Sequence, residues 1–335
     1  MMIQSIKARF SLARALGHGV FGALVLAWAA WTATAFFFHL EGLALYLGWG
    51  ALAGVTVLAG LGRLRARRVG WLTLVAAFVL TVGWYQTIRP AEMRDWAFDV
   101  ARGVTADVEG DLVHLTDVRN FDWHTDTTAT ARWEQRTYDL STLARVDMVT
   151  SVWDTPDIAH LLVSFGFDDG AHVVFSVETR KEADESYNTL GGFFRQFELV
   201  LVAATEEDII KLRTNYRAED VRLYPIDLTA EQRRDLFMSY VALAQDLEAR
   251  PAFYNTLTAN CTTTVFRLAR VLNPDLRPDW RIVLSGNLPD YVEAQGVLEG
   301  DIPLDERVAA AAITAKAQAY QGADFSKALR ATEER

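Results

Sequence analysis

The chain has 335 residues, of which 51% are hydrophobic, and its formal net charge at pH 7 is −10. This length allows one large domain or two smaller ones. The acidic balance argues against nucleic-acid binding, which needs a basic surface. The single cysteine excludes an intramolecular disulfide.

The first 88 residues differ from the rest in charge and in hydrophobicity. They hold seven Lys and Arg residues against Glu41 alone, a net charge of +6, so residues 89–335 carry −16. Three apolar runs, at residues 18–38, 42–61 and 70–88, are each long enough to cross the hydrocarbon core of a bilayer. We therefore predict a membrane domain over residues 1–88 and a soluble domain over residues 89–335.

The basic residues predict how the three spans thread the membrane. They lie in the N-terminal segment and in a loop expected at residues 63–68, and basic loops stay in the cytoplasm. We expect a three-pass protein of the cytoplasmic (inner) membrane, with its N-terminus in the cytoplasm and its soluble domain in the periplasm. No span carries an ionisable residue at its centre, so a transport role has no support.

The soluble domain is predicted to begin with strands and to continue with helices. Short strands and loops are expected over residues 91–150, and a further strand over residues 197–204. Thr205 and Thr229 begin capping-box patterns, which predict two helix starts, and the second helix is expected to run to about Arg250. This order predicts an α+β fold.

The strongest strand signal is a hairpin formed by residues 158–167 and 171–179. The Asp-Gly pair at 169–170 separates two β-rich runs. A three-residue loop places His160 opposite Glu178 and Leu162 opposite Ser176. A two-residue loop shifts the register by one residue and removes that pairing.

The lone cysteine, Cys261, stands where a helix is predicted to begin. Asn260 is a favourable N-cap, and an amphipathic pattern follows as far as Asn273. The helix dipole favours the thiolate of a cysteine in the first turn, so Cys261 is a candidate nucleophile. The competing interpretation is a small buried side chain.

A cysteine nucleophile needs a base and a group that orients the base. His160 is the preferred base because it lies in an otherwise apolar strand, with Glu178 opposite it in the favoured register. His172, near the turn on the same face, is the second choice, so the third member is open between Glu178 and His172. His114 and His124 are expected to be surface residues in loops. A half-exposed polar pair is the competing interpretation of His160 and Glu178.

Two further features bear on ligands. Ser176, Glu178 and Arg180 form an alternating polar series, in which Arg180 either contacts an anionic head group or forms a surface salt bridge at the strand end. The sequence has no HExxH motif, no Cys/His cluster and no Gly-rich phosphate loop. We therefore predict no metal and no cofactor.

Together these motifs resemble the Lnb N-terminal periplasmic domain, a family named after a bacterial lipoprotein N-acyltransferase. The resemblance covers roughly residues 110–300. Its pieces are Ile158-Ala-His160, Phe165-x-Phe167-x-Asp-Gly170, Ser176-x-Glu178-x-Arg180, Tyr187 with Gly191-Gly192-Phe193, Tyr254-Asn-Thr-Leu-x-x-Asn260-Cys261-Thr-Thr, and Leu284-Ser-Gly-Asn-Leu-Pro-Asp-Tyr291. More remotely, a histidine strand followed by a cysteine helix resembles circularly permuted, NlpC-type papain-like folds. Lecithin:retinol acyltransferase is one of these and has a similar Asn-Cys element.

The resemblance implies a permuted papain-like domain after the three spans, with Cys261 as nucleophile and His160 as base. Glu178 as the third member follows from the hairpin register. The remaining candidates are expected to support the substrate or the oxyanion; they are Asn260, Ser176, Arg180 and Tyr254.

The favoured function is that of a membrane-anchored cysteine acyltransferase. It would move a fatty acyl chain from a phospholipid, through a Cys261 thioester, to an amine acceptor such as a lipoprotein N-terminus. The alternatives are a papain-like peptidase or amidase acting on cell-envelope peptides and a non-catalytic membrane-tethered module. A lipid site should be lined by aromatic residues such as Phe193, Phe194 and Phe253, whereas a peptide site should be an open polar cleft.

Overall fold

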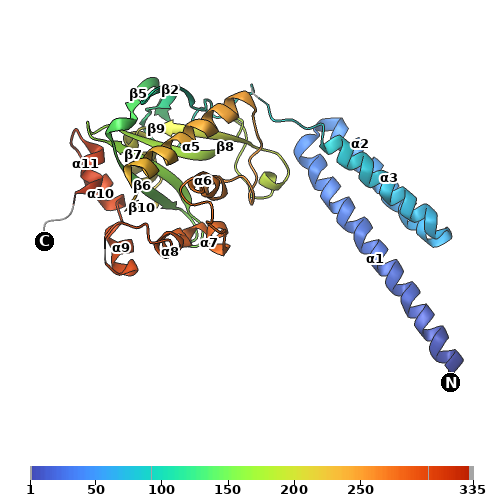
Figure 1. Ribbon diagram of the computed structural model, residues 1–335. Helices are drawn as coiled ribbons and strands as arrows, with labels where there is room; N and C mark the ends of the chain where they lie inside the picture. Colours follow the sequence, from blue (N-terminus) through green and yellow to red (C-terminus); the bar gives the residue numbers. More distant parts are fainter. Residues whose placement is uncertain (1, 92, 301, 332–335) are drawn as a thin grey trace. The chain divides into compact units, whose positions relative to one another are not determined.

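The computed structural model describes residues 2–91, 93–300 and 302–331 (Figure 1). The chain divides into two compact units. The first contains the chain up to Pro90 together with Phe193–Gln196, and the second contains the remainder. A four-residue segment from the middle of the soluble sequence therefore packs with the membrane helices.

Three long apolar helices form most of the first unit: α1 (Met2–His39), α2 (Gly42–Arg65) and α3 (Arg67–Tyr85). Each is long and apolar enough to cross a membrane, so the three predicted spans are confirmed as helices. The predicted basic loop at residues 63–68 is wrong, because only Ala66 leaves helical geometry, with φ −148° and ψ 110°. The third helix ends at Tyr85, three residues before the predicted end.

Close packing explains the short break at Ala66. A Cβ atom on Gly70 would lie 2.7 Å from the backbone of Arg63, so α2 and α3 approach each other there more closely than side chains allow. The guanidinium of Arg63 donates to the Gly17 carbonyl at 3.0 Å and lies 5.4 Å from the ring centre of Phe21. These contacts replace part of the hydration of a charged group that is 8% exposed.

The second unit is built on an eight-stranded sheet. Its strand order is β1 (Thr105–Glu109), β2 (Leu112–Arg119), β9 (Glu198–Ala204), β8 (His172–Arg180), β7 (His160–Phe167), β6 (Leu143–Val152) and β10 (Asp220–Pro225), with β5 (Trp133–Asp139) also paired to β2. A separate ribbon pairs β3 (Asp122–Trp123) with β4 (Ala129–Thr130). Within the described chain, the neighbours are antiparallel except for one parallel bridge between β2 and β9.

The β7–β8 hairpin has the predicted register. Leu162 pairs with Ser176. The Phe167 N–H donates to the Ala171 carbonyl at 2.9 Å, which closes a three-residue loop. Gly170 in that loop has φ +85°, a left-handed conformation that glycine adopts without strain.

Most helices follow the strands, as predicted. The helices of this unit are α4 (Glu206–Lys211), α5 (Ala230–Ala249), α6 (Cys261–Ala269), α7 (Trp280–Val283), α8 (Leu288–Ala294), α9 (Leu304–Ala310), α10 (Thr314–Ala319) and α11 (Phe325–Arg330). The strand β10 lies between α4 and α5, where the sequence predicted none. Short 3₁₀ turns occur at Leu140–Thr142, Gly191–Phe193 and Ser285–Asn287, and a π-helix at Leu212–Tyr216. Helix α6 ends at Ala269, four residues before Asn273, where the sequence predicts its end. The mixed α and β architecture is therefore confirmed.

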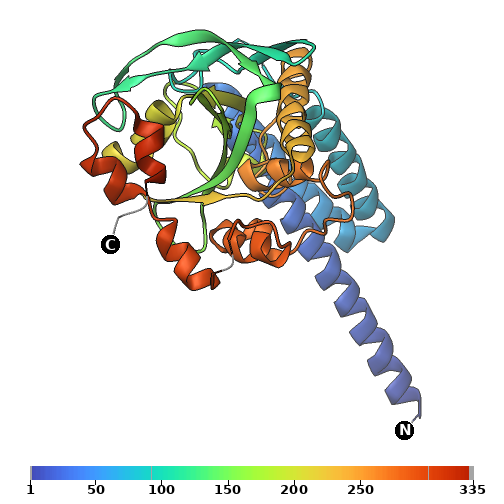
Figure 2. The same ribbon diagram turned by 60° about the vertical axis from the view of Figure 1, so that its left-hand side comes forward.

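Helices cover both faces of the sheet, so the central strands are buried on two sides (Figures 1 and 2). On one face, Phe165 and Phe175 of the hairpin pack against Phe237 and Tyr240 of α5. The opposite face packs against α4, α10 and α11. This burial on both faces explains why the sequence of β7 is nearly all apolar. His160, the polar residue at the start of β7, is therefore an exception in this strand.

A buried ion cluster ties the last helix to the second face. Arg330 donates to carboxylate oxygens of Asp147 and Glu206, each at 2.6 Å, and these carboxylates are at most 1% exposed. Ser164 donates to Glu206 at 2.5 Å. Burial alone raises the pKa of Glu206, but the hydrogen bond and charge of Arg330 outweigh it and lower the pKa. Glu206 is thus held as a carboxylate inside the fold.

Candidate active site

Asn260 builds the helix start that presents Cys261. Its side-chain oxygen accepts hydrogen bonds from the backbone N–H groups of Thr262, at 3.0 Å, and Thr263, at 2.8 Å. The Thr263 hydroxyl accepts from the Asn260 N–H at 3.1 Å, which completes a capping box. The Asn260 amide nitrogen donates to the Thr256 carbonyl at 2.7 Å. This side chain therefore positions Cys261, and because Asn260 also lines the cleft, its support of substrate or oxyanion stays a prediction.

Removing this cap should loosen the site. We expect Asn260→Ala to lower the free energy of unfolding by about 0.5–2 kcal/mol, because first-turn N–H groups lose their acceptor. Asn260→Ser keeps an acceptor oxygen and should be much closer to wild type. Thermal unfolding of both variants in detergent measures the difference, and equal stability of the two variants would contradict the capping role.

His160, the first residue of β7, links Cys261 to Glu178. Its imidazole interacts with the thiol of Cys261, and each group shifts the pKa of the other. The ring nitrogen Nε2 lies 3.1 Å from Glu178 Oε1 and 2.7 Å from Ser176 Oγ. The structure therefore brings together the thiol, the base and the carboxylate that the sequence predicts.

The Glu178 carboxylate is itself held in place from two sides. Its Oε1 accepts from Ser176 Oγ at 2.7 Å and from Arg213 Nη2 at 3.0 Å. Ser176 is fully buried, and the Arg213 side chain is 6% exposed. Arg213 also donates to the Ile209 carbonyl at 3.0 Å. Ser176, predicted to support substrate, instead bridges the imidazole and the carboxylate.

These contacts favour a thiolate–imidazolium pair. Burial lowers the pKa of His160, but the charges of Glu178 and Cys261 outweigh it and raise the pKa to about 9. Burial raises the pKa of Cys261, but the charge and hydrogen bond of His160, helped by the Leu161 N–H, lower it. Burial raises the pKa of Glu178, but the interactions with His160 and Arg213 outweigh it and hold the pKa well below its usual value.

Ser285 and Gly286 fix the strand end that carries His160. Ser285 Oγ accepts from the Ala159 N–H at 2.8 Å and donates to the Ala159 carbonyl at 2.6 Å. The Gly286 N–H donates to the Asp157 carbonyl at 2.9 Å. A Cβ atom on Gly286 would overlap the Pro156 carbonyl oxygen, so only glycine fits there.

Adding that Cβ atom should displace His160. We expect Gly286→Ala to lower the free energy of unfolding by about 1–3 kcal/mol, because the backbone has to move apart. Ser285→Ala removes the hydrogen bonds without the overlap and should cost less. Thermal unfolding together with the rate of Cys261 alkylation measures both effects. A Gly286→Ala variant with wild-type stability would contradict the close approach.

The residues of this site all lie in one stretch of the chain. Residues 129–286 match the family model of the Lnb N-terminal periplasmic domain. The resemblance seen in the sequence is therefore confirmed for this segment, which contains His160, Glu178, Cys261 and Gly286. No curated protein and no solved structure matches the chain. With the three apolar helices, the match indicates a membrane protein with a periplasmic domain.

The second unit has a cleft of about 770 Å³ at Cys261. Exposed apolar side chains in its walls are Trp153, Tyr187, Leu257, Val283 and Leu284. Charged residues that line it besides the catalytic group are Asp99, Asp154, Lys181, Arg213, Arg217 and Glu219. The aromatic residues expected at a lipid site are not in its walls: Phe193 and Phe194 belong to the first compact unit, and Phe253 pairs with the start of β9. The cleft nonetheless offers an apolar surface beside the thiol.

Tyr254 lies in the cleft wall close to the thiol. It is 8% exposed, and it interacts electrostatically with Cys261 and by hydrogen bonds with Tyr187 and Thr179. Burial, the largest cause, raises the pKa of Tyr254, so the hydroxyl keeps its proton. It therefore remains a candidate to support substrate.

The other histidines of the second unit lie away from the dyad. His172 begins β8 at the turn end of the hairpin, where its Nδ1 lies 3.0 Å from the Gly170 carbonyl oxygen, and it does not line the cleft. His114 lies in β2, so its predicted loop position is wrong, although the side chain is exposed. His124 is an exposed residue outside the strands, as expected. The structure thus places Glu178, and not His172, beside His160.

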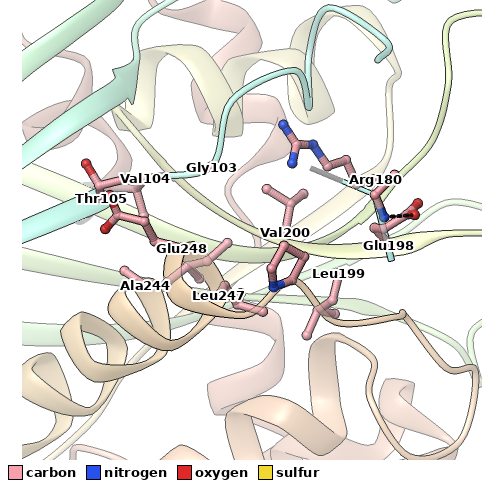
Figure 3. Close-up of a pocket in the computed structure, with 13 residues that line it drawn as sticks. Gly103, Val104, Thr105, Arg180, Glu198, Leu199, Val200, Ala244, Leu247 and Glu248 are labelled. Atoms are coloured by element: carbon pink, nitrogen blue, oxygen red, sulfur yellow. Dashed lines mark hydrogen bonds between the residues drawn. The ribbon is translucent and has the colours of Figure 1, made fainter. Parts of the chain in front are cut away.

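Arg180 does not reach the cleft, which corrects its predicted contact with substrate. Its guanidinium donates to the Val100 and Ala101 carbonyls and lies 4.5 Å from the Trp96 ring centre. It borders a separate cavity of about 220 Å³ between β9 and α5, with Val200 and Leu247 (Figure 3). Backbone carbonyls of the chain before β1 capture this side chain at the strand end.

Sequence reasoning missed Arg213 and Ser285. Arg213 lies on the π-helix Leu212–Tyr216, and no local pattern marks a residue there as a partner of β8. Ser285 lay inside a matched motif but had no predicted role. Within the residues that the structure describes, no group of His, Cys, Asp and Glu is placed to hold a metal ion.

Proposed function

We propose that this protein is a membrane-anchored cysteine acyltransferase. The observation that carries the proposal is the series Cys261–His160–Glu178 at the start of α6, in which the thiol interacts with the imidazole and the imidazole lies 3.1 Å from the carboxylate. In a thiolate–imidazolium pair, the thiolate is the nucleophile and the protonated imidazole is the proton donor. The apolar cleft walls support an acyl donor, and the membrane helices support a donor that is a phospholipid.

In the first half-reaction, the Cys261 thiolate attacks the carbonyl carbon of a phospholipid ester. The backbone N–H of Cys261 stabilises the resulting oxyanion, since the next N–H groups of α6, those of Thr262 and Thr263, donate to Asn260. The C–O ester bond then breaks, and the imidazolium of His160 gives its proton to the departing alkoxide. The products are a Cys261 thioester, a lysophospholipid and a neutral imidazole.

In the second half-reaction, a neutral amine attacks the thioester carbonyl. His160 accepts the amine proton, and the C–S bond breaks to release the Cys261 thiolate. The product is an amide, and the thiolate–imidazolium pair is restored. A lipoprotein N-terminus is the amine acceptor that we propose.

The proposal includes the finer assignments of fold and location. A strand histidine that precedes a cysteine at a helix start supports a permuted papain-like, NlpC-type arrangement. The basic residues at 63–68 and in the N-terminal segment support a cytoplasmic N-terminus and a periplasmic cleft at the inner membrane.

The test is to incubate the full-length protein with acyl-labelled phospholipid and to measure its intact mass. We expect one hydroxylamine-sensitive acyl group on wild type and none on Cys261→Ala. Addition of an amine-bearing lipopeptide should discharge the adduct and label the peptide.

Two results separate this proposal from its alternatives. Loss of acyl groups to water alone, with cleavage of cell-envelope peptides, would indicate a papain-like hydrolase. Absence of both activities in wild type, with Cys261 unreactive toward iodoacetamide, would indicate a non-catalytic membrane-tethered module.

A further inference from the structure

The segment between β8 and β9 belongs to both compact units. Residues up to Gly192 lie in the unit that holds Cys261, whereas Phe193–Gln196 pack with the membrane helices. Chain order alone would place all of these residues in the soluble domain. The excursion therefore needs specific contacts to explain it.

Phe194 and Arg195 make those contacts within the first unit. The Phe194 ring centre lies 5.8 Å from that of Phe38, and its carbonyl oxygen lies 2.6 Å from His39 Nε2, both at the end of α1. Arg195 donates to the Tyr85 carbonyl at 2.9 Å and lies 4.5 Å from the Tyr85 ring centre, at the end of α3. These aromatic helix ends are typical of the membrane–water interface.

The backbone at Arg195 also indicates a specific conformation. Its φ is +59°, which a residue with a side chain adopts only where the surroundings stabilise it. Phe194 is 8% exposed, so the segment is embedded and not merely resting on the helices.

The residues just before this segment form a wall of the catalytic cleft. Tyr187 and Thr189 line the cleft, and the Thr189 carbonyl accepts from Thr256 Oγ1 at 2.9 Å. Gly192 packs so closely on Thr256 and Tyr254 that a Cβ atom would overlap the threonine hydroxyl. Only three residues separate Thr189 from Phe193. The chain is therefore held at both ends of a very short span.

We propose that Phe194 and Arg195 are positioning residues, which bind the ends of α1 and α3 and thereby order the Tyr187–Gly192 wall of the cleft. The membrane helices then shape the site in addition to anchoring it. The effect on acyl transfer rests on the proposed function, whereas the ordering of the wall does not.

Hydrogen–deuterium exchange of the full-length protein in lipid nanodiscs tests the ordering. Arg195→Ala should speed exchange in residues 187–192 and 254–260 by at least about tenfold, because it removes a charged hydrogen bond and a cation–π contact. Exchange in β7 and β9 should be unchanged. The matched control is Arg250→Ala, which removes an arginine side chain that is 81% exposed.

A second variant guards against misfolding of the first. Tyr85→Leu removes the ring beneath the guanidinium and should speed exchange in the same two segments. In the double variant with Arg195→Ala, exchange should speed up by less than the two single effects combined, because both substitutions remove the same contact. Wild-type exchange in both single variants, or faster exchange throughout the sheet, would overturn the proposal.

Acyl transfer in the same nanodiscs provides a separate readout. If the wall binds the donor, Arg195→Ala should raise KM several-fold more than it lowers kcat. Absence of acyl transfer in wild type would refute the proposed function. The positioning role of Arg195 would then be tested by hydrogen–deuterium exchange alone.

Discussion

Replacement of His160 by alanine is expected to slow acyl transfer by about 10²–10⁴-fold, because the thiolate loses its proton acceptor and its counter-charge. Initial rates with acyl-labelled phospholipid and an amine-bearing peptide measure this loss. The control is His124→Ala, an exposed residue outside the cleft. A His160→Ala enzyme with the wild-type rate would contradict the assigned base.

The pH dependence of Cys261 alkylation tests the same ion pair without any substrate. In wild type the thiolate should persist below the ordinary thiol pKa of 9.0, since His160 lowers the Cys261 pKa. In His160→Ala, only the Leu161 N–H still opposes burial, so the alkylation midpoint should move to higher pH than in wild type. Acyl transfer by wild type should also decline as the pH rises through about 9, where the imidazolium proton is lost.

Replacement of Glu178 by glutamine is expected to slow acyl transfer by about 10–100-fold. The amide keeps the shape of the side chain but removes the charge that raises the His160 pKa, and one to two pKa units correspond to that factor. The upper limb of the pH–rate profile should shift below about 9. Glu207→Gln, at a side chain that is 62% exposed, is the matched control.

The same substitution predicts a pH-dependent change in stability. The pKa of Glu178 is depressed in the folded state, so its stabilisation is complete above the ordinary value of 4.5 and is lost as the pH falls below it. Glu178→Gln should therefore lower the Tm at pH 7, also because Arg213 loses its carboxylate partner. The difference in Tm from wild type should narrow below pH 4.5. A constant difference from pH 7 to 3 would contradict this linkage.

Local sequence patterns predicted the hairpin and the helix start well, because both depend on neighbours in the chain. The Asp-Gly turn fixes the register that pairs Leu162 with Ser176, and Asn260 caps the helix at Cys261. Arg213 and Ser285 reach the site through tertiary packing from distant segments, which no local period reveals. The break at Ala66 depends on close helix packing at Gly70, and the hydrophobic pattern alone shows no such approach.

The excursion of Phe193–Gln196 was equally hidden in the sequence. Two aromatic residues and an arginine between strands are compatible with an ordinary surface loop, and only their contacts with the ends of α1 and α3 distinguish them. Arg180 illustrates the reverse error. It follows Glu178 at the correct spacing for the same face, yet backbone carbonyls near β1 bind its side chain.

The Arg330 cluster determines which fragment of this protein can fold. The family match stops at residue 286, yet the cation that neutralises Asp147 and Glu206 is 44 residues further on. A fragment limited to residues 129–286 would keep Arg145, 3.5 Å from Asp147, but would lack the arginine that pairs with both buried carboxylates, and it would also lack β1 and β2. The end of the family match and the end of the folded unit therefore differ. Expression of the periplasmic part should extend from about residue 91 to at least Arg330.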